Sequence, residues 1–185
     1  IVLRQLEIAK LLGADTILVV PAFVKDDEHG YDACYKRSQE ELAKILPEAE
    51  KLGINIGVEN VWNKFLMSPL EMARYVDELG SPYAGVYFDV GNVLNFGFPE
   101  QWIRILGKRI KKVHLKDFKT STGNITGFVP LLAGNVNWPS VVAALREIGY
   151  DDTLTAEMSP YVYHPLQAVY DTARHIDVIL GGEPK

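Results

Sequence analysis

The sequence predicts an α/β protein in which a parallel sheet is covered by helices. Short continuous apolar runs rich in β-branched residues, such as residues 16–21, are typical of strands buried on both faces. Between these runs apolar residues recur at helical spacing, and a glycine such as Gly13 follows a helix end. The strict alternation of the two patterns favours parallel strands, either closed as a barrel or open and doubly wound.

The first expected element is a helix over residues 3–12, and the later elements follow in pairs. They are strand 16–21 and helix 38–52, strand 54–59 and helix 69–79, strand 84–89 and helix 99–107, strand 110–115 and helix 139–148, and strand 153–157 and helix 165–180. A complete (β/α)8 barrel has eight strands in roughly 250 residues. We expect residues 1–185 to form a single domain, which would be a partial barrel lacking about the first three strands if the sheet closes.

Composition and charge narrow the classes of partner. The net charge of −5 and the pI near 5.4 offer no broad positive field, so nucleic acid is not expected as a partner. The longest apolar run, residues 17–24, is far shorter than the roughly 20 residues that cross a bilayer, and no membrane partner is expected. Cys34 is the single cysteine, so no internal disulfide can form and a cytoplasmic setting is expected.

Four residues with metal-binding or acid/base side chains occupy the carboxyl ends of four predicted strands. They are Glu59 in GVEN, Asp89 in YFDVGN, His114 in VHLKD and Glu157 in TAEM. Each alone could cap a helix or serve a structural role, but parallel strands open their carboxyl ends onto one common face. Burying three acids together without a cation would be costly. Three carboxylates and one imidazole suit Mn²⁺ or Mg²⁺, and Co²⁺ or Zn²⁺ would also be compatible.

These stretches also carry a resemblance to a known family. The segments GVENVWNKFLMSP, SPYAGVYFDVGN, KKVHLKD, AGNVNW and TAEM resemble the sugar phosphate isomerase/epimerase family, whose relatives include hexulose-phosphate isomerases, ribulose-phosphate 3-epimerases and ketose 3-epimerases. The similarity runs in the expected order through almost the whole chain. It implies a xylose isomerase-like (β/α)8 TIM barrel and a divalent-metal-dependent enzyme, with Mn²⁺ favoured, that acts on a ketose or sugar phosphate.

The resemblance also implies roles for the four strand-end residues. All four would bind one metal ion, and Glu59 and Glu157 would double as the acid/base pair. Isomerising or epimerising a ketose requires removal of a proton next to a carbonyl, and a chelating metal stabilises the resulting enediolate. Two carboxylates on opposite faces of the substrate can then exchange the proton.

Substrate contacts are expected from weaker candidates. Lys116 and Lys119 could meet a phosphate or polarise a substrate oxygen, or remain solvated. Asn92 stands where ketose 3-epimerases carry histidine, and it could bind substrate or cap the next helix. Trp62 could pack against a sugar face or in the core, whereas Trp138 is expected to be a packing residue.

The remaining histidines, His29, His164 and His175, are expected to have structural or solvent-exposed roles. Three alternative functions stay open. A related sugar or polyol dehydratase, or a simple aldose–ketose isomerase, could use the same residues, and a non-catalytic sugar-binding barrel would not require both glutamates. An endonuclease-type relative would need more histidines and a more basic surface. Whether the sugar is phosphorylated, and whether copies of the chain associate, also stays open.

Overall fold

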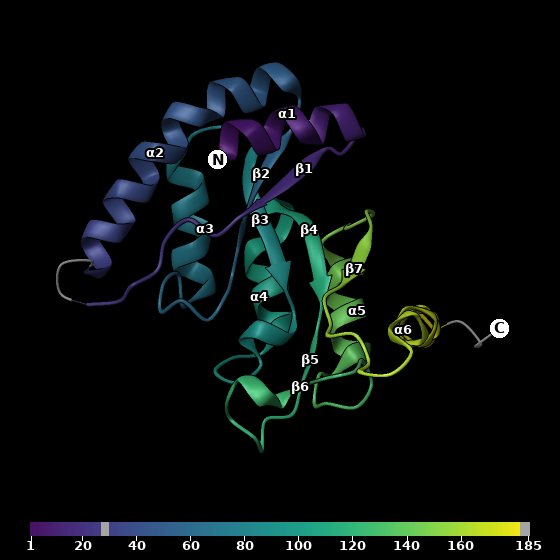
Figure 1. Ribbon diagram of the computed structural model, residues 1–185. Coiled ribbons are helices and arrows are strands. Elements are labelled where there is room, and N and C mark those ends of the chain that lie inside the picture. Colours follow the sequence, from purple (N-terminus) through teal and green to yellow (C-terminus); the bar gives the residue numbers. More distant parts are fainter. Residues whose placement is uncertain (27–29, 182–185) are drawn as a thin grey trace. The chain divides into compact units, whose positions relative to one another are not determined.

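A computed structural model describes residues 1–26 and 30–181, and its main sheet has five strands in the order β1-β2-β3-β4-β7 (Figure 1). The strands are β1 (Thr16–Val19), β2 (Asn55–Glu59), β3 (Ala84–Asp89), β4 (Ile110–Leu115) and β7 (Leu154–Ala156). The pairs β1–β2, β2–β3 and β4–β7 are parallel. The predicted sequential, parallel α/β architecture is confirmed.

Within the described residues, six α-helices alternate with these strands. They are α1 (Val2–Leu12), α2 (Tyr31–Leu52), α3 (Pro69–Glu78), α4 (Pro99–Leu106), α5 (Trp138–Glu147) and α6 (Pro165–Ile179). The prediction for α2 was wrong at its start, because the helix begins seven residues before the expected Ser38 and follows Gly30, whose backbone is extended. The expectation for His29 lies outside the described residues. Among the residues that the structure describes, no helix has the length and apolarity needed to cross a membrane.

The chain divides into two compact units. The first contains Ile1–Phe88 and Ile105–Lys112, and the second contains Asp89–Arg104 and Val113–Lys185. Strands β3 and β4 therefore each begin in the first unit and end in the second. Because the division falls within these strands, their carboxyl-terminal residues belong to the second unit.

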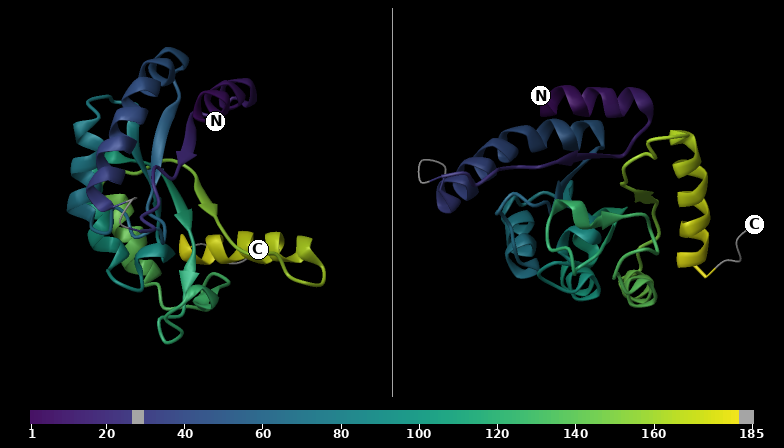
Figure 2. Two further views of the ribbon diagram at one scale, coloured as in Figure 1. Left: turned by 60° about the vertical axis from the view of Figure 1, so that its left-hand side comes forward. Right: turned by 60° about the horizontal axis from the view of Figure 1, so that its bottom comes forward.

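In the first unit, α1 and α2 lie side by side and pack on β1 and β2 (Figures 1 and 2). An aromatic cluster, defined by Tyr31, Tyr35, Phe65 and Tyr75, forms part of the core around α2 and α3. Its buried polar groups are satisfied, since the Tyr75 hydroxyl donates to Ser38 Oγ at 2.8 Å. The early start of α2 follows from this cluster, because Tyr31 and Tyr35 bury ring surface that helical spacing of aliphatic residues does not reveal.

In the second unit, a small antiparallel hairpin that the sequence did not predict follows β4. Its strands are β5 (Asp117–Phe118) and β6 (Phe128–Val129). The rings of Phe118 and Phe128 pack edge to face, with centroids 5.1 Å apart. Asp117 is fully buried, and its carboxylate accepts five N–H bonds of 2.9–3.3 Å. The donors are the backbone amides of Phe118, Leu132, Gly134 and Val136 and the indole of Trp138.

This carboxylate fixes the loop over residues 130–137 that precedes α5. Gly134 approaches Asp117 so closely that a Cβ at this position would lie 2.1 Å from Oδ1, which no side chain tolerates. Trp138 is buried at the start of α5, as the sequence predicted for a packing residue, and its indole hydrogen bond adds a polar function to that packing.

Candidate metal centre

The carboxyl ends of β3, β4 and β7 are joined by backbone hydrogen bonds in the second unit. The amide of Val90 donates to the carbonyl of His114 at 3.1 Å, and the amide of Glu157 donates to the carbonyl of Leu115 at 3.0 Å. Asp89, His114 and Glu157 are thereby held at one edge of three neighbouring strands. The strand-end convergence predicted from the sequence is present for these three residues.

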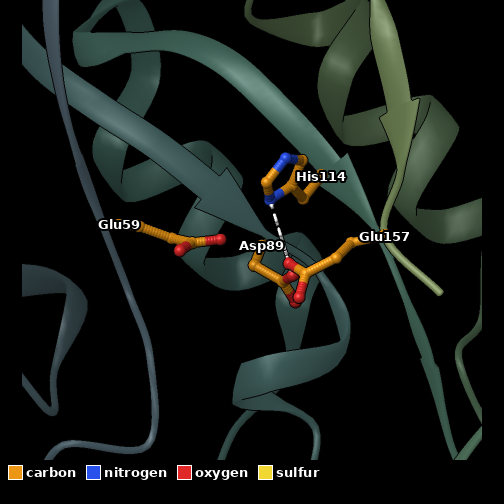
Figure 3. Close-up of side chains that lie close together, drawn as sticks. All are labelled: Glu59, Asp89, His114 and Glu157. Atoms are coloured by element: carbon orange, nitrogen blue, oxygen red, sulfur yellow. Dashed lines mark ion pairs between the residues drawn. The ribbon is translucent and has the colours of Figure 1, made fainter. Parts of the chain in front are cut away.

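Their side chains point toward one another (Figure 3). Nδ1 of His114 lies 3.3 Å from Oε2 of Glu157 and 4.0 Å from Oδ2 of Asp89. The Asp89 side chain is completely buried, that of His114 is 13% exposed and that of Glu157 is 50% exposed. The centre is thus buried at Asp89 and accessible to solvent at Glu157.

The two oxygens of Asp89 have different surroundings. Oδ1 accepts from the backbone amide of Asn92 at 2.7 Å, in the 3₁₀ turn η2 (Gly91–Val93), whereas Oδ2 faces His114 and Lys116. The Asn92 side chain is buried, and its Oδ1 accepts from Nζ of Lys116 at 3.3 Å. Asn92 therefore both terminates the strand and contacts the lysine of the HLKD segment.

Lys116 lies within the same group of charges. Its ammonium is 3.3 Å from Oδ2 of Asp89, 3.1 Å from Oε1 of Glu157 and 4.8 Å from the centre of the Phe128 ring. Burial lowers the pKa of Lys116, but the Asp89 and Glu157 carboxylates outweigh that effect, so the pKa is raised above its ordinary value. Lys116 is consequently a charged member of the centre.

Three further sequence candidates, Glu59, Trp62 and Lys119, lie on segments other than β3, β4 and β7. Glu59 ends β2 in the first unit, where it is 6% exposed and stands opposite Tyr87 of β3 in register. Trp62 is 36% exposed in the loop after β2, and Lys119 is exposed after β5. The alternative of core packing for Trp62 is therefore not supported by its exposure.

The two described histidines outside the centre lie at the start of α6 and within it. His164 is exposed directly before the helix, with a left-handed backbone at φ 58°, and His175 is half-buried within it. Neither belongs to the group of His, Cys, Asp and Glu side chains that could hold a metal ion among the described residues. Their positions agree with the structural roles expected from the sequence.

Sequence reasoning missed Asp117 and the orientation of Lys116. Asp117 accepts hydrogen bonds from the loop before α5 and is not one of the candidate metal ligands. No periodic pattern in the sequence marks it. The orientation of Lys116 could have been predicted from the alternation of strand side chains, because residues two apart, such as His114 and Lys116, point to the same face. Both side chains do contact Glu157.

The chemistry of the donor set fits a divalent cation. One ligand atom each from Asp89, His114 and Glu157 lies within 4.8 Å of the others. Ligands that bind one ion at about 2.0–2.3 Å stand at most about 4.6 Å apart, so small side-chain adjustments suffice. Carboxylate oxygens with an imidazole nitrogen suit Mn²⁺, Mg²⁺, Co²⁺ or Zn²⁺. The group could therefore hold a metal ion.

Comparisons with known proteins identify relatives of this chain. The putative L-ribulose-5-phosphate 3-epimerase SgbU of Escherichia coli K12 is 28% identical over 159 residues, which cover 84% of this chain and 55% of that protein. The chain spans about half the length of the curated relatives it matches. Two of the relatives are named as putative L-ribulose-5-phosphate 3-epimerases.

Solved structures show the same fold. The structure of an L-ribulose 3-epimerase has a TM-score of 0.78 at 18% identity, covering 97% of this chain and 66% of that one. A crystal structure of IOLI protein with a zinc atom has a TM-score of 0.80 at 19% identity, covering 97% and 67% of the two chains. The family described as xylose isomerase-like TIM barrel matches residues 1–178. The chain therefore belongs to the xylose isomerase-like TIM barrel family.

Proposed function

We propose that the chain carries the metal centre of an isomerase or epimerase that acts on a ketose or ketose phosphate through an enediolate. The observation that supports this most directly is the convergence of Asp89, His114 and Glu157 at adjoining strand ends. The relatives named as ribulose-phosphate 3-epimerases supply the reaction class. A zinc atom in a protein of the same fold is consistent with a divalent ion here, for which we favour Mn²⁺.

Glu59 is proposed as the fourth ligand. It stands opposite Tyr87 in the parallel register of β2 and β3, and Asp89 follows Tyr87 by two residues in the same strand. Paired strands lie about 4.8 Å apart and a strand rises about 3.3 Å per residue, so the two Cα atoms should be about 8 Å apart. Two carboxylates at that spacing can reach one ion between them.

The residues would then divide the chemistry. Asp89 and His114 would hold the ion, which when bound stabilises negative charge on the substrate oxygens. Glu59 and Glu157 would remove the proton beside the carbonyl and return it, and the exposure of Glu157 gives it access to substrate. Of the two carboxylates in the second unit, the buried Asp89 would hold the ion and the accessible Glu157 would transfer the proton.

Four further residues are proposed to bind substrate. The Asn92 amide and the Lys116 ammonium lie close to the carboxylates and would meet oxygens near the reacting carbons. Trp62 and Lys119 are exposed, so they suit a sugar face and a terminal phosphate respectively. A phosphorylated substrate would depend on Lys119 more strongly than a free ketose would.

The test is proton exchange in D₂O with Mn²⁺ and a panel of ketoses and ketose 5-phosphates. We expect deuterium to enter the carbon beside the carbonyl, because a proton held by a carboxylate exchanges with solvent. Glu157→Gln should lower this exchange by at least ~10²-fold, the lower range for a lost acid/base group. Mass spectrometry of the recovered sugar measures the incorporation, and metal occupancy is checked for each variant.

Glu41→Gln provides the matched control. Glu41 is an exposed glutamate of α2 that pairs with Lys44 one turn along, so its substitution should leave the exchange rate unchanged. Equal losses in both variants would show that the effect of Glu157→Gln is not specific to the centre. Product formation without any deuterium incorporation would contradict the enediolate route.

A further inference from the structure

Lys116 contacts the carboxylate oxygens that a metal ion would need. Its ammonium lies 3.3 Å from Oδ2 of Asp89, the same oxygen that faces His114 Nδ1 at 4.0 Å. It lies 3.1 Å from Oε1 of Glu157, whose other oxygen, Oε2, faces His114. The lysine thus shares both carboxylates with the proposed ligand set instead of lying beside it.

The position of Lys116 does not depend on those carboxylates alone. Its backbone packs against Gly91, where a Cβ would lie 2.6 Å from the Lys116 carbonyl oxygen, so the DVGN segment needs glycine there. Asn92 Oδ1 accepts from the ammonium at 3.3 Å, and the Phe128 ring lies 4.8 Å from it. These groups would keep the positive charge near the centre even when Asp89 and Glu157 bind an ion.

Two opposite effects on metal binding are conceivable for such a lysine. By contacting both carboxylates it could preorganise them and so favour the ion. By adding a fixed positive charge and using their lone pairs it would oppose the ion, and a dication feels this repulsion twice as strongly as a monovalent charge. The centre is largely buried, where charges are poorly screened, so repulsion should outweigh preorganisation.

We propose that Lys116 competes with the divalent ion for Asp89 and Glu157 and thereby weakens metal affinity. This inference rests on the metal centre of the proposed function. The lysine offsets part of the negative charge that the two carboxylates create, and the ion must take over those contacts on binding. The competition keeps the ion exchangeable and leaves an ammonium next to it.

Calorimetric titration of the whole chain with Mn²⁺ tests the proposal. Lys116→Met removes the charge and keeps an apolar chain of similar shape, and it should bind Mn²⁺ at least ~10-fold more tightly than the unmodified protein. Lys116→Arg keeps the charge and should stay within about 3-fold of the unmodified protein. Lys119→Met is the control. Lys119 is an exposed lysine three residues after Lys116, so removing its charge should change the Mn²⁺ affinity by less than about 2-fold.

The outcomes separate the inference from the function on which it rests. If the unmodified protein binds Mn²⁺ and Lys116→Met binds it equally or more weakly, the lysine preorganises the centre and the proposal is overturned. If neither protein binds Mn²⁺, the metal centre itself is wrong. Thermal unfolding shows whether Lys116→Met is folded, and Lys116→Gln, which is also uncharged but polar, replaces it if it is not.

Discussion

Two clusters, one in each compact unit, bury polar groups in different ways. The aromatic cluster of the first unit buries neutral hydroxyls, such as that of Tyr75, which donates to Ser38. The second unit buries charges, namely the carboxylates of Asp89 and Asp117 and most of the Lys116 side chain. A neutral hydroxyl needs only one or two hydrogen bonds, whereas a buried charge needs several donors or a counter-charge.

The difference is also visible in ionisation. Burial raises the pKa of Tyr75 to about 12, so the first unit keeps its phenols neutral. In the second unit, burial acts against the charge of Lys116, but the surrounding carboxylates keep the pKa of this ammonium raised. The second unit therefore depends on a balance of charges, which is what a site for a cation and an anionic intermediate requires.

Removing the Asp117 carboxylate should produce the largest loss of stability. Asp117→Ala leaves four backbone amides and the Trp138 indole without their acceptor in a buried loop. Each unsatisfied buried donor costs about 1–3 kcal/mol, and relaxation of the loop recovers part of the sum, so we expect a loss of at least ~3 kcal/mol. Urea denaturation at pH 7 measures the free energy of unfolding.

Asp15→Ala is the control for that variant. Asp15 is an exposed aspartate of the first unit that pairs with Lys112, so its loss should cost less than about 1 kcal/mol. If Asp117→Ala were as mild as Asp15→Ala, the buried carboxylate would not organise the second unit. The contrast between the two units would then lose its clearest energetic support.

The sequence predicted best those elements whose ends coincide with a change in residue chemistry. Strands β3 and β4 have the predicted bounds, since each apolar run ends next to a ligand-type residue, Asp89 or His114. The fold class followed from this alternation together with the family resemblance. The metal-binding candidates followed from the rule that parallel strands share a carboxyl edge.

What the sequence did not predict depends on contacts between distant residues. The hairpin β5–β6 has two-residue strands, too short for any periodic signal. The role of Asp117 is defined by N–H donors 15 to 21 residues along the chain, and that of Lys116 by Asp89 and Asn92 at the end of another strand. Such partners become neighbours only once the fold has formed.

A smaller effect is expected from alkaline pH on the first unit. The pKa of Tyr75 is about 12 in the folded chain against an ordinary value of 10, so the unfolded chain loses this proton first. Stability should therefore be intact below pH 10 and fall as the pH rises toward 12, with Tyr75 accounting for roughly 1 kcal/mol at pH 11. Urea denaturation at pH 8 and pH 11 gives the difference.

Tyr75→Phe isolates that contribution. The variant loses the hydrogen bond to Ser38, about 1 kcal/mol at pH 8, but its further loss between pH 8 and pH 11 should be smaller than that of the unmodified chain. Tyr163→Phe, which replaces an exposed tyrosine, should follow the unmodified chain at both pH values. An identical pH dependence for all three proteins would contradict the neutral burial of Tyr75.

The smallest effect should come from the pair of Arg109 and Asp77 in the first unit, because both side chains lie at the surface. Arg109 donates to both oxygens of Asp77 at 2.7 Å, and this hydrogen bonding lowers the pKa of Asp77. A depressed carboxyl pKa gives stability that is present above the ordinary value of 3.8 and lost as the pH falls below it.

Solvent screens the pair, so Asp77→Asn should lower stability by less than about 1 kcal/mol at pH 7, and the difference should shrink at pH 3. Urea midpoints of both proteins at the two pH values measure it, and 0.5 M NaCl should reduce the pH 7 difference further. A loss larger than that of Asp117→Ala would reverse the comparison, because this surface pair of the first unit would then contribute more to stability than the buried carboxylate of the second unit.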